Sequence, residues 1–161
     1  GWESHEIAAH FGGWVTGVVE SIRRTKKVEK AFSPFHKGDG HVTDDTLMTR
    51  VLELDENYYH GGAHLFFGVY YGAKPPMLGG DFERSARHFD KARAVSGGKL
   101  LLGDLLRAQY LARQQLDRRQ FHERLTAVIN APPDVFPEMA LVNAIAKQKA
   151  GQLLAKEKEW F

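Results

Sequence analysis

Clusters of glycine and proline divide this chain into short segments in which apolar residues recur every three or four positions. Such a period gathers apolar side chains on one face of an α-helix, whereas a half-buried strand needs alternation. The main breaks lie at 33–42, 74–80, 96–98 and 131–133. Because no segment between them has a convincing strand pattern, the sequence predicts an all-α fold of helices joined by turns.

The helices themselves are predicted between these breaks. They span about 3–31, 44–55, 61–73, 81–95, 100–115, 118–130 and 137–160. Thr43 or Asp44 is expected to cap the second helix, because a side-chain oxygen there accepts a hydrogen bond from the first turn. Pro137 stands in the first turn of the last helix, where proline is favoured. The apolar face expected for that helix consists of Val142, Ile145, Ala146, Ala150, Leu153 and Leu154.

The composition limits the classes of protein to which the chain can belong. It has 161 residues, of which 43% are hydrophobic and 26% charged, as in a soluble globular protein. The net charge of +2 is too close to neutral to indicate a nucleic-acid binder. The absence of cysteine excludes disulfides, thiol catalysis, Cys-ligated zinc and lipid attachment through a Cys in this chain. No signal peptide or membrane span is evident, which leaves a cytoplasmic protein or a processed piece of a longer one.

A repeat of about 34 residues organises the middle of the chain. The motif His64-x2-Phe67-Gly68-x2-Tyr71 matches the first half of the tetratricopeptide pattern, with His in place of Trp. The motif Ser85-x3-Phe89-x2-Ala92 matches the second half. One unit later, Ala108-x2-Leu111 and Gln120-x3-Arg124-x2-Ala127 fit the same template more weakly. The sequence therefore predicts tetratricopeptide-like helical hairpins with an additional N-terminal helix, and the alternative is a generic bundle of helical hairpins.

Two segments are more specific than ordinary repeat residues. They are the loop Lys74-Pro-Pro-Met-Leu-Gly-Gly80 and the stretch Asn143-Ala-Ile-Ala-Lys147. Together with Val51–Gly68 and the ending Leu153–Phe161, they resemble the T component of TRAP transporters over about Leu47 to Phe161. The resemblance implies an all-α periplasmic lipoprotein, able to form ring-like trimers, that partners the transporter's solute-binding subunit. The family is usually nearly twice as long as this chain.

This resemblance leads to a functional hypothesis for the loop. We expect a non-enzymatic scaffold that binds a protein partner, and an apolar ligand in a groove lined by the first helix of each hairpin. The loop is longer than a repeat needs, and its prolines lower the entropy lost on binding. The alternative is that its two apolar residues fold back and cover the end of the hairpin. The expected binding surface consists of Tyr70, Tyr71, Lys74, Pro75, Pro76, Met77 and Leu78.

The start of the chain resembles a different family. The stretch Gly40-His-Val-Thr-Asp-Asp-Thr-Leu-Met-Thr-Arg50 is similar to the signature of ADP-ribosylglycohydrolases. That resemblance implies Mg²⁺ ligands at Thr43, Asp44 and Asp45, because Mg²⁺ prefers hard oxygen ligands. The Asp-x-Asp motif that completes the site in that family is absent from this chain. The competing hypotheses are therefore an inactive fragment of such a hydrolase with Mg²⁺, or a plain helix N-cap with acids in the first turn and no cofactor.

Several assignments stay open at this point. We expect two parts, a helix and loop of uncertain origin at 1–42, less stably attached, and a helical repeat domain at 43–161. Whether the chain is a fusion or a fragment is left open, as is a helical domain without retained function. His60 and His64, four residues apart, are expected either to bind a metal or to pack. The five tyrosines are expected either to line a groove or to pack between helices.

Overall fold

The computed structural model describes residues 44–161, so the helix predicted at 3–31 and the loop at 33–42 lie outside the described residues. The part of the chain that the structure describes contains helices and no strand, which confirms the all-α fold. Its α-helices are α3 (Asp44–Leu54), α4 (Tyr58–Gly72), α5 (Phe82–Ser96), α6 (Leu101–Leu106), α7 (Arg118–Asn130), α8 (Ala140–Ala155) and α9 (Glu157–Trp160). The shorter turns are η2 (Pro76–Leu78), the π-helix η3 (Arg107–Ala112) and η4 (Pro137–Met139).

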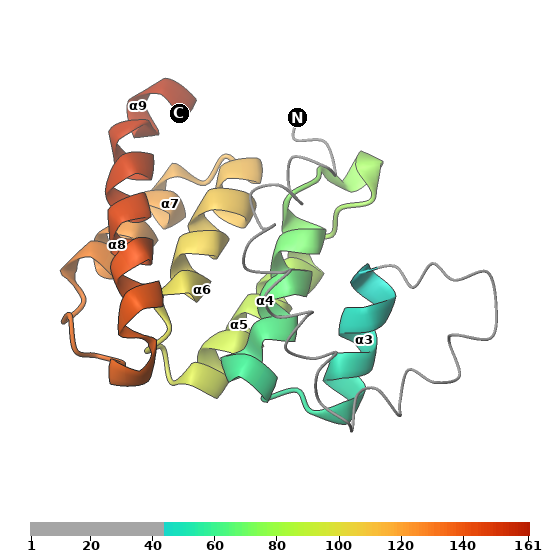
Figure 1. The fold of residues 1–161 in the computed structure, drawn as a ribbon. Helices are drawn as coiled ribbons and strands as arrows, with labels where there is room; N and C mark the ends of the chain where they lie inside the picture. Colours follow the sequence, from blue (N-terminus) through green and yellow to red (C-terminus); the bar gives the residue numbers. More distant parts are fainter. Residues whose placement is uncertain (1–43) are drawn as a thin grey trace.

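The helices follow one another across the molecule from α3 at one side to α8 at the other (Figure 1). Helices α4 and α5 form one closely packed hairpin, and α6 with its continuation η3 forms a second hairpin with α7. Helix α3 packs on α4, and α8 packs on both α6 and α7. This order is that of stacked helical hairpins, and the narrower tetratricopeptide assignment stays a prediction.

Small residues allow α4 and α5 to approach closely. A Cβ atom on Gly68 would lie 2.8 Å from the ring of Phe89, and one on Gly72 would lie 2.6 Å from the Ser85 Oγ. The buried Ser85 hydroxyl donates a hydrogen bond of 2.5 Å to the carbonyl oxygen of Gly68. The repeat motif predicted Gly68, Ser85 and Phe89 at this contact, because its glycine and small residue let large neighbours fill the space between paired helices. Gly72 was not part of that motif.

Helix α7 buries a different face from the one that the repeat pattern indicated. The repeat pattern placed Gln120, Arg124 and Ala127 on the packed face. The buried residues have the same spacing, but each lies one position later in the sequence. The buried residues are Phe121, Leu125 and Val128. The reason is chemical, because Gln120 and Arg124 are polar and hydrogen-bond to each other at 3.0 Å, while the apolar neighbours gain most from burial.

The last predicted helix is divided into η4, α8 and α9. Its expected apolar face packs on the core except at Ile145, and Asn143, which was not expected there, is buried as well. Ile145 is 51% exposed, whereas Asn143 is 2% exposed. The Asn143 side chain accepts a 3.0 Å hydrogen bond from the backbone N–H of Leu101 and donates one of 3.0 Å to the Lys99 carbonyl. The first N–H groups of a helix have no hydrogen-bond partner inside that helix. The Asn143 side chain supplies such a partner to Leu101 in the first turn of α6. Lys147 donates to the Ala131 carbonyl, so both polar ends of the Asn143–Lys147 stretch anchor α8.

The first turn of α4 is not a regular helix. Tyr59, His60 and Gly61 have φ values of 50°, 56° and 82°, in the left-handed region. Two of these residues carry a Cβ, so the conformation is strained. A Cβ on Gly61 would also lie 3.2 Å from the Cα of Ala92. The regular part of α4 therefore begins after Gly61, close to the predicted start.

Candidate partner-binding surface

The loop between α4 and α5 has a tightly bonded backbone. The Pro75 carbonyl accepts hydrogen bonds from the N–H groups of Leu78 at 2.9 Å and Gly80 at 3.1 Å. The Asp81 N–H donates to the Tyr71 carbonyl at 2.9 Å. A Cβ on Gly80 would lie 1.8 Å from the Lys74 carbonyl oxygen, so only glycine permits this closure. The loop is thus held in one shape where it projects beyond α4 and α5 (Figure 1).

The two apolar residues at the tip of this loop point away from the core. Met77 is 89% exposed and Leu78 is 68% exposed. The alternative in which they cover the end of the hairpin is therefore wrong. The structure brings them into one loop with residues of the end of α4, and we call the whole set the loop surface. It consists of Tyr70, Tyr71, Lys74, Pro75, Pro76, Met77 and Leu78.

Aromatic rings extend from the loop surface along α4. Tyr70 is 40% exposed and stands edge-on to Tyr71, with ring centroids 5.2 Å apart. The half-buried ring of Tyr71 lies under the Arg84 guanidinium at 4.6 Å and stacks on His88 at 5.9 Å. The Lys74 ammonium lies 6.0 Å from the Tyr70 ring. This side of the loop surface therefore combines aromatic rings with positive charge.

The tyrosines do not line a single groove. Tyr110 is buried in the core, and burial raises its pKa to about 12. Tyr58 and Tyr59 pack with the cluster of Leu47 and Met48 between α3 and α4. Packing was thus the right interpretation for these three, and Tyr70 and Tyr71 alone belong to the loop surface.

Beside the aromatic rings lies a pair of histidines that the sequence analysis missed, of which His64 is buried and His88 is partly buried. His64 Nδ1 is 3.0 Å from His88 Nδ1, and His64 Nε2 is 3.2 Å from the Glu56 carboxylate. Burial lowers the pKa of His88 to about 4, and the neighbouring His64 and the positive charges of Lys91, Arg84 and Arg87 act in the same direction. Burial also lowers the pKa of His64, against the opposing effect of Glu56. Both imidazoles are therefore neutral at pH 7, and their hydrogen bond joins α4 to α5.

The candidate metal ligands are not brought together. His60 stands against the ring of Phe136, with centroids 4.8 Å apart, whereas His64 faces His88. Within residues 44–161 no group of three His, Asp or Glu side chains could hold a metal ion. Thr43 and the side chain of Asp44 lie outside the described residues, and Asp44 begins α3. The Mg²⁺ site at Thr43, Asp44 and Asp45 thus stays an untested expectation.

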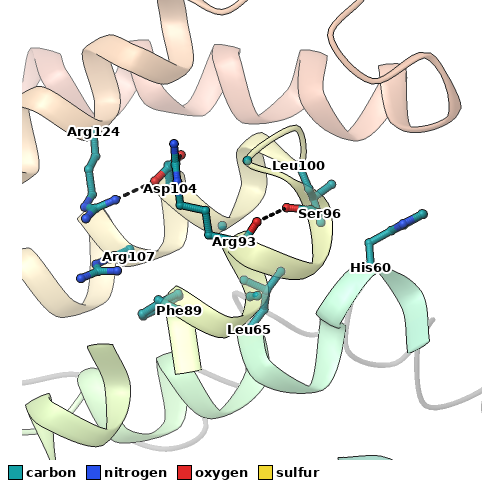
Figure 2. A pocket seen from close by; sticks show the side chains of 12 residues that line it. His60, Leu65, Phe89, Arg93, Ser96, Leu100, Asp104, Arg107 and Arg124 are labelled. Atoms are coloured by element: carbon teal, nitrogen blue, oxygen red, sulfur yellow. Dashed lines mark hydrogen bonds and ion pairs between the residues drawn. The ribbon is translucent and has the colours of Figure 1, made fainter. Parts of the chain in front are cut away.

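The described residues form a small pocket between the two hairpins (Figure 2). Its cavity volume is about 10 Å³, which is room for about one water molecule. Arg93, Arg107 and Arg124 line it together with Asp104. This pocket has neither the volume nor the lining of the apolar ligand groove that the sequence analysis expected.

The paired helices place the chain among all-α proteins built from helical hairpins. The model of one family, the TRAP transporter T-component, matches residues 41–161, and the chain belongs to this family. The resemblance stated for about Leu47 to Phe161 is thereby confirmed. A search of curated proteins finds none that matches. The resemblance to ADP-ribosylglycohydrolases receives no support, and Thr43 to Asp45 lie inside the matched range.

Membership in this family indicates an accessory role in TRAP transport. None of the described helices is long and apolar enough to cross a membrane.

Proposed function

We propose that this chain is a periplasmic scaffold whose loop surface binds the solute-binding subunit of its TRAP transporter. The observation that carries the proposal is the exposure of Met77 and Leu78, at 89% and 68%, on a loop with a fixed backbone. Exposed apolar side chains gain free energy when a partner covers them. A segment already held in one shape also loses little conformational entropy on binding.

The surroundings of these two residues fit a protein partner. Tyrosine is enriched at protein interfaces, because it offers a large rigid ring and a polar end. Tyr70 and Tyr71 supply two such rings beside the loop. Lys74 and Arg84 add positive charge near the rings, which favours a partner with an acidic rim. We also propose, as the resemblance implies, that the helical hairpins are tetratricopeptide-like and that the chain forms a ring-like trimer.

The test replaces Met77→Ser and Leu78→Ser together and measures two quantities. The melting temperature should hardly change, because exposed side chains contribute little to the stability of the folded chain. Capture of the purified solute-binding subunit of the same transporter should be lost. The matched control is Leu141→Ser, since Leu141 is 74% exposed on α8 at a distance along the chain from the loop surface.

A double variant that binds the subunit as tightly as the unchanged protein would overturn the proposal. Equal loss of binding in Leu141→Ser would assign the contact to another surface.

A further inference from the structure

One exposed arginine beside the loop surface has no counter-charge. Among the arginines of residues 44–161, Arg84 and Arg113 alone form no ion pair with a carboxylate. Both guanidinium groups lie over an aromatic ring, Arg84 over Tyr71 at 4.6 Å and Arg113 over Trp160 at 3.6 Å. Arg113 is half-buried at the C-terminal end of the helical stack, whereas Arg84 is exposed. Arg84 is therefore the exposed arginine of this range whose charge is not neutralised.

The carboxylates near Arg84 are already engaged. Both carboxylates of α5 form ion pairs with other arginines, Glu83 at 3.1 Å and Asp90 at 2.6 Å. Asp81, just before the helix, accepts a 3.0 Å hydrogen bond from the backbone N–H of Arg84 and so caps α5. Helix α4, which packs against α5, contains no Asp or Glu. In this hairpin and its loop, no carboxylate therefore pairs with the Arg84 guanidinium.

Arg84 begins a row of positive charge along one face of α5. Arg84, Arg87 and Lys91 are exposed and follow one another at three- and four-residue spacing, which places them on the same side of a helix. Burial lowers the pKa of His88, and these three charges add to the effect, so all of them lie close to its ring. That ring stacks on Tyr71 at 5.9 Å. The row therefore adjoins the loop surface through Tyr71 and attracts negative charge.

The guanidinium of Arg84 is suited to a carboxylate in particular. It donates no hydrogen bond to another side chain within residues 44–161, so its five N–H donors are available. The planar fork of a guanidinium matches the two oxygens of a carboxylate. The contact with Tyr71 already restricts the position of the guanidinium, which lowers the conformational entropy lost when a ligand binds.

We propose that Arg84 binds an Asp or Glu side chain of the solute-binding subunit at the edge of the loop surface. This inference rests on the proposed function and adds the chemical group that the partner presents. Burial of Met77 and Leu78 supplies apolar binding energy, whereas Arg84 selects a partner with an acidic residue beside that contact. Lys91 and Arg87 raise the rate of association, because their charges attract an acidic surface before contact.

The experiment measures binding of the purified solute-binding subunit by surface plasmon resonance at low and at high ionic strength. Arg84→Gln should weaken binding about tenfold, because a charge-assisted hydrogen bond is lost, and should reduce the effect of salt on the affinity. Arg84→Lys keeps the charge but not the fork, so it should recover only part of the lost affinity. The matched control is Arg119→Gln, since Arg119 is 82% exposed on α7 and pairs with Glu123 at 2.8 Å. It should bind as the unchanged protein does.

The outcomes separate this inference from the proposed function. If Arg84→Gln binds normally while Met77→Ser with Leu78→Ser abolishes binding, the carboxylate contact is wrong and the loop surface stands. If the subunit does not bind the unchanged protein, both are wrong. Binding of the unchanged protein to phosphatidylglycerol vesicles, lost in Arg84→Gln, would assign the guanidinium to a membrane surface and overturn the inference. An affinity of the unchanged protein that does not fall with salt would also overturn it, and that measurement needs no variant.

Discussion

Replacing Gly72 with alanine should lower the free energy of unfolding by about 3 kcal/mol. The new Cβ would lie 2.6 Å from the Ser85 Oγ and 3.4 Å from the Leu111 Cβ. Overpacking of this kind costs about 1–3 kcal/mol. Displacing the Ser85 hydroxyl also weakens its hydrogen bond to Gly68, worth about 1 kcal/mol, while the better helix propensity of alanine returns a similar amount. Urea denaturation of the purified protein measures the change.

Two further variants show whether the close approach of α4 and α5 is the cause. Gly151→Ala, on α8, meets nothing within 4 Å and should stabilise the protein by about 0.5–1 kcal/mol. Ser85→Ala combined with Gly72→Ala removes the clashing oxygen and should restore a large part of the lost stability. A Gly72→Ala protein as stable as Gly151→Ala would refute the packing described for the first hairpin.

Acid should destabilise the protein through His88. The folded state keeps this imidazole neutral down to a pH of about 4, whereas in the unfolded chain it takes up a proton near 6.5. The unfolded state therefore binds more protons between these two pH values, and the free energy of unfolding falls as the pH is lowered from 6.5 to 4. With allowance for the partial exposure of His88, the loss should be about 2 kcal/mol.

Carboxylates also take up protons in acid and change the free energy of unfolding, so the contribution of His88 has to be separated from theirs. His88→Gln removes the titrating group, so its stability should depend less on pH over this interval by about 2 kcal/mol. NMR titration of the His88 ring gives its pKa directly. A ring that titrates near 6.5 would contradict both the burial and the contact with His64.

The sequence predicted the features that depend on local spacing. The bounds of α7 agree with the prediction, and α5 begins beside Asp81, whose side chain accepts a 3.0 Å hydrogen bond from the Arg84 N–H. The close approach of α4 and α5 also followed from a motif, because Gly68 and Phe89 are fixed positions in the repeat pattern. Each of these features is determined by residues within one helix or one hairpin, so the local sequence is enough to predict it.

Features that depend on contacts between distant residues were not predicted. His64 and His88 are 24 positions apart, and no spacing rule places their rings together. The arginine pocket draws its side chains from three elements, so it exists only once the hairpins are stacked. Asn143 was singled out in the sequence, but its role was missed, because it bonds the backbone of α6, which the sequence of α8 does not reveal.

Site-specific photocrosslinking tests the central claim most directly. A photoreactive phenylalanine analogue placed at position 77 and one placed at position 141 both lie at exposed sites, because Met77 and Leu141 are 89% and 74% exposed. The protein is illuminated in the presence of the solute-binding subunit of its transporter. We predict a crosslinked product of the two proteins from position 77 and none from position 141. A product from position 141 alone would contradict the assignment of the loop surface as the binding site.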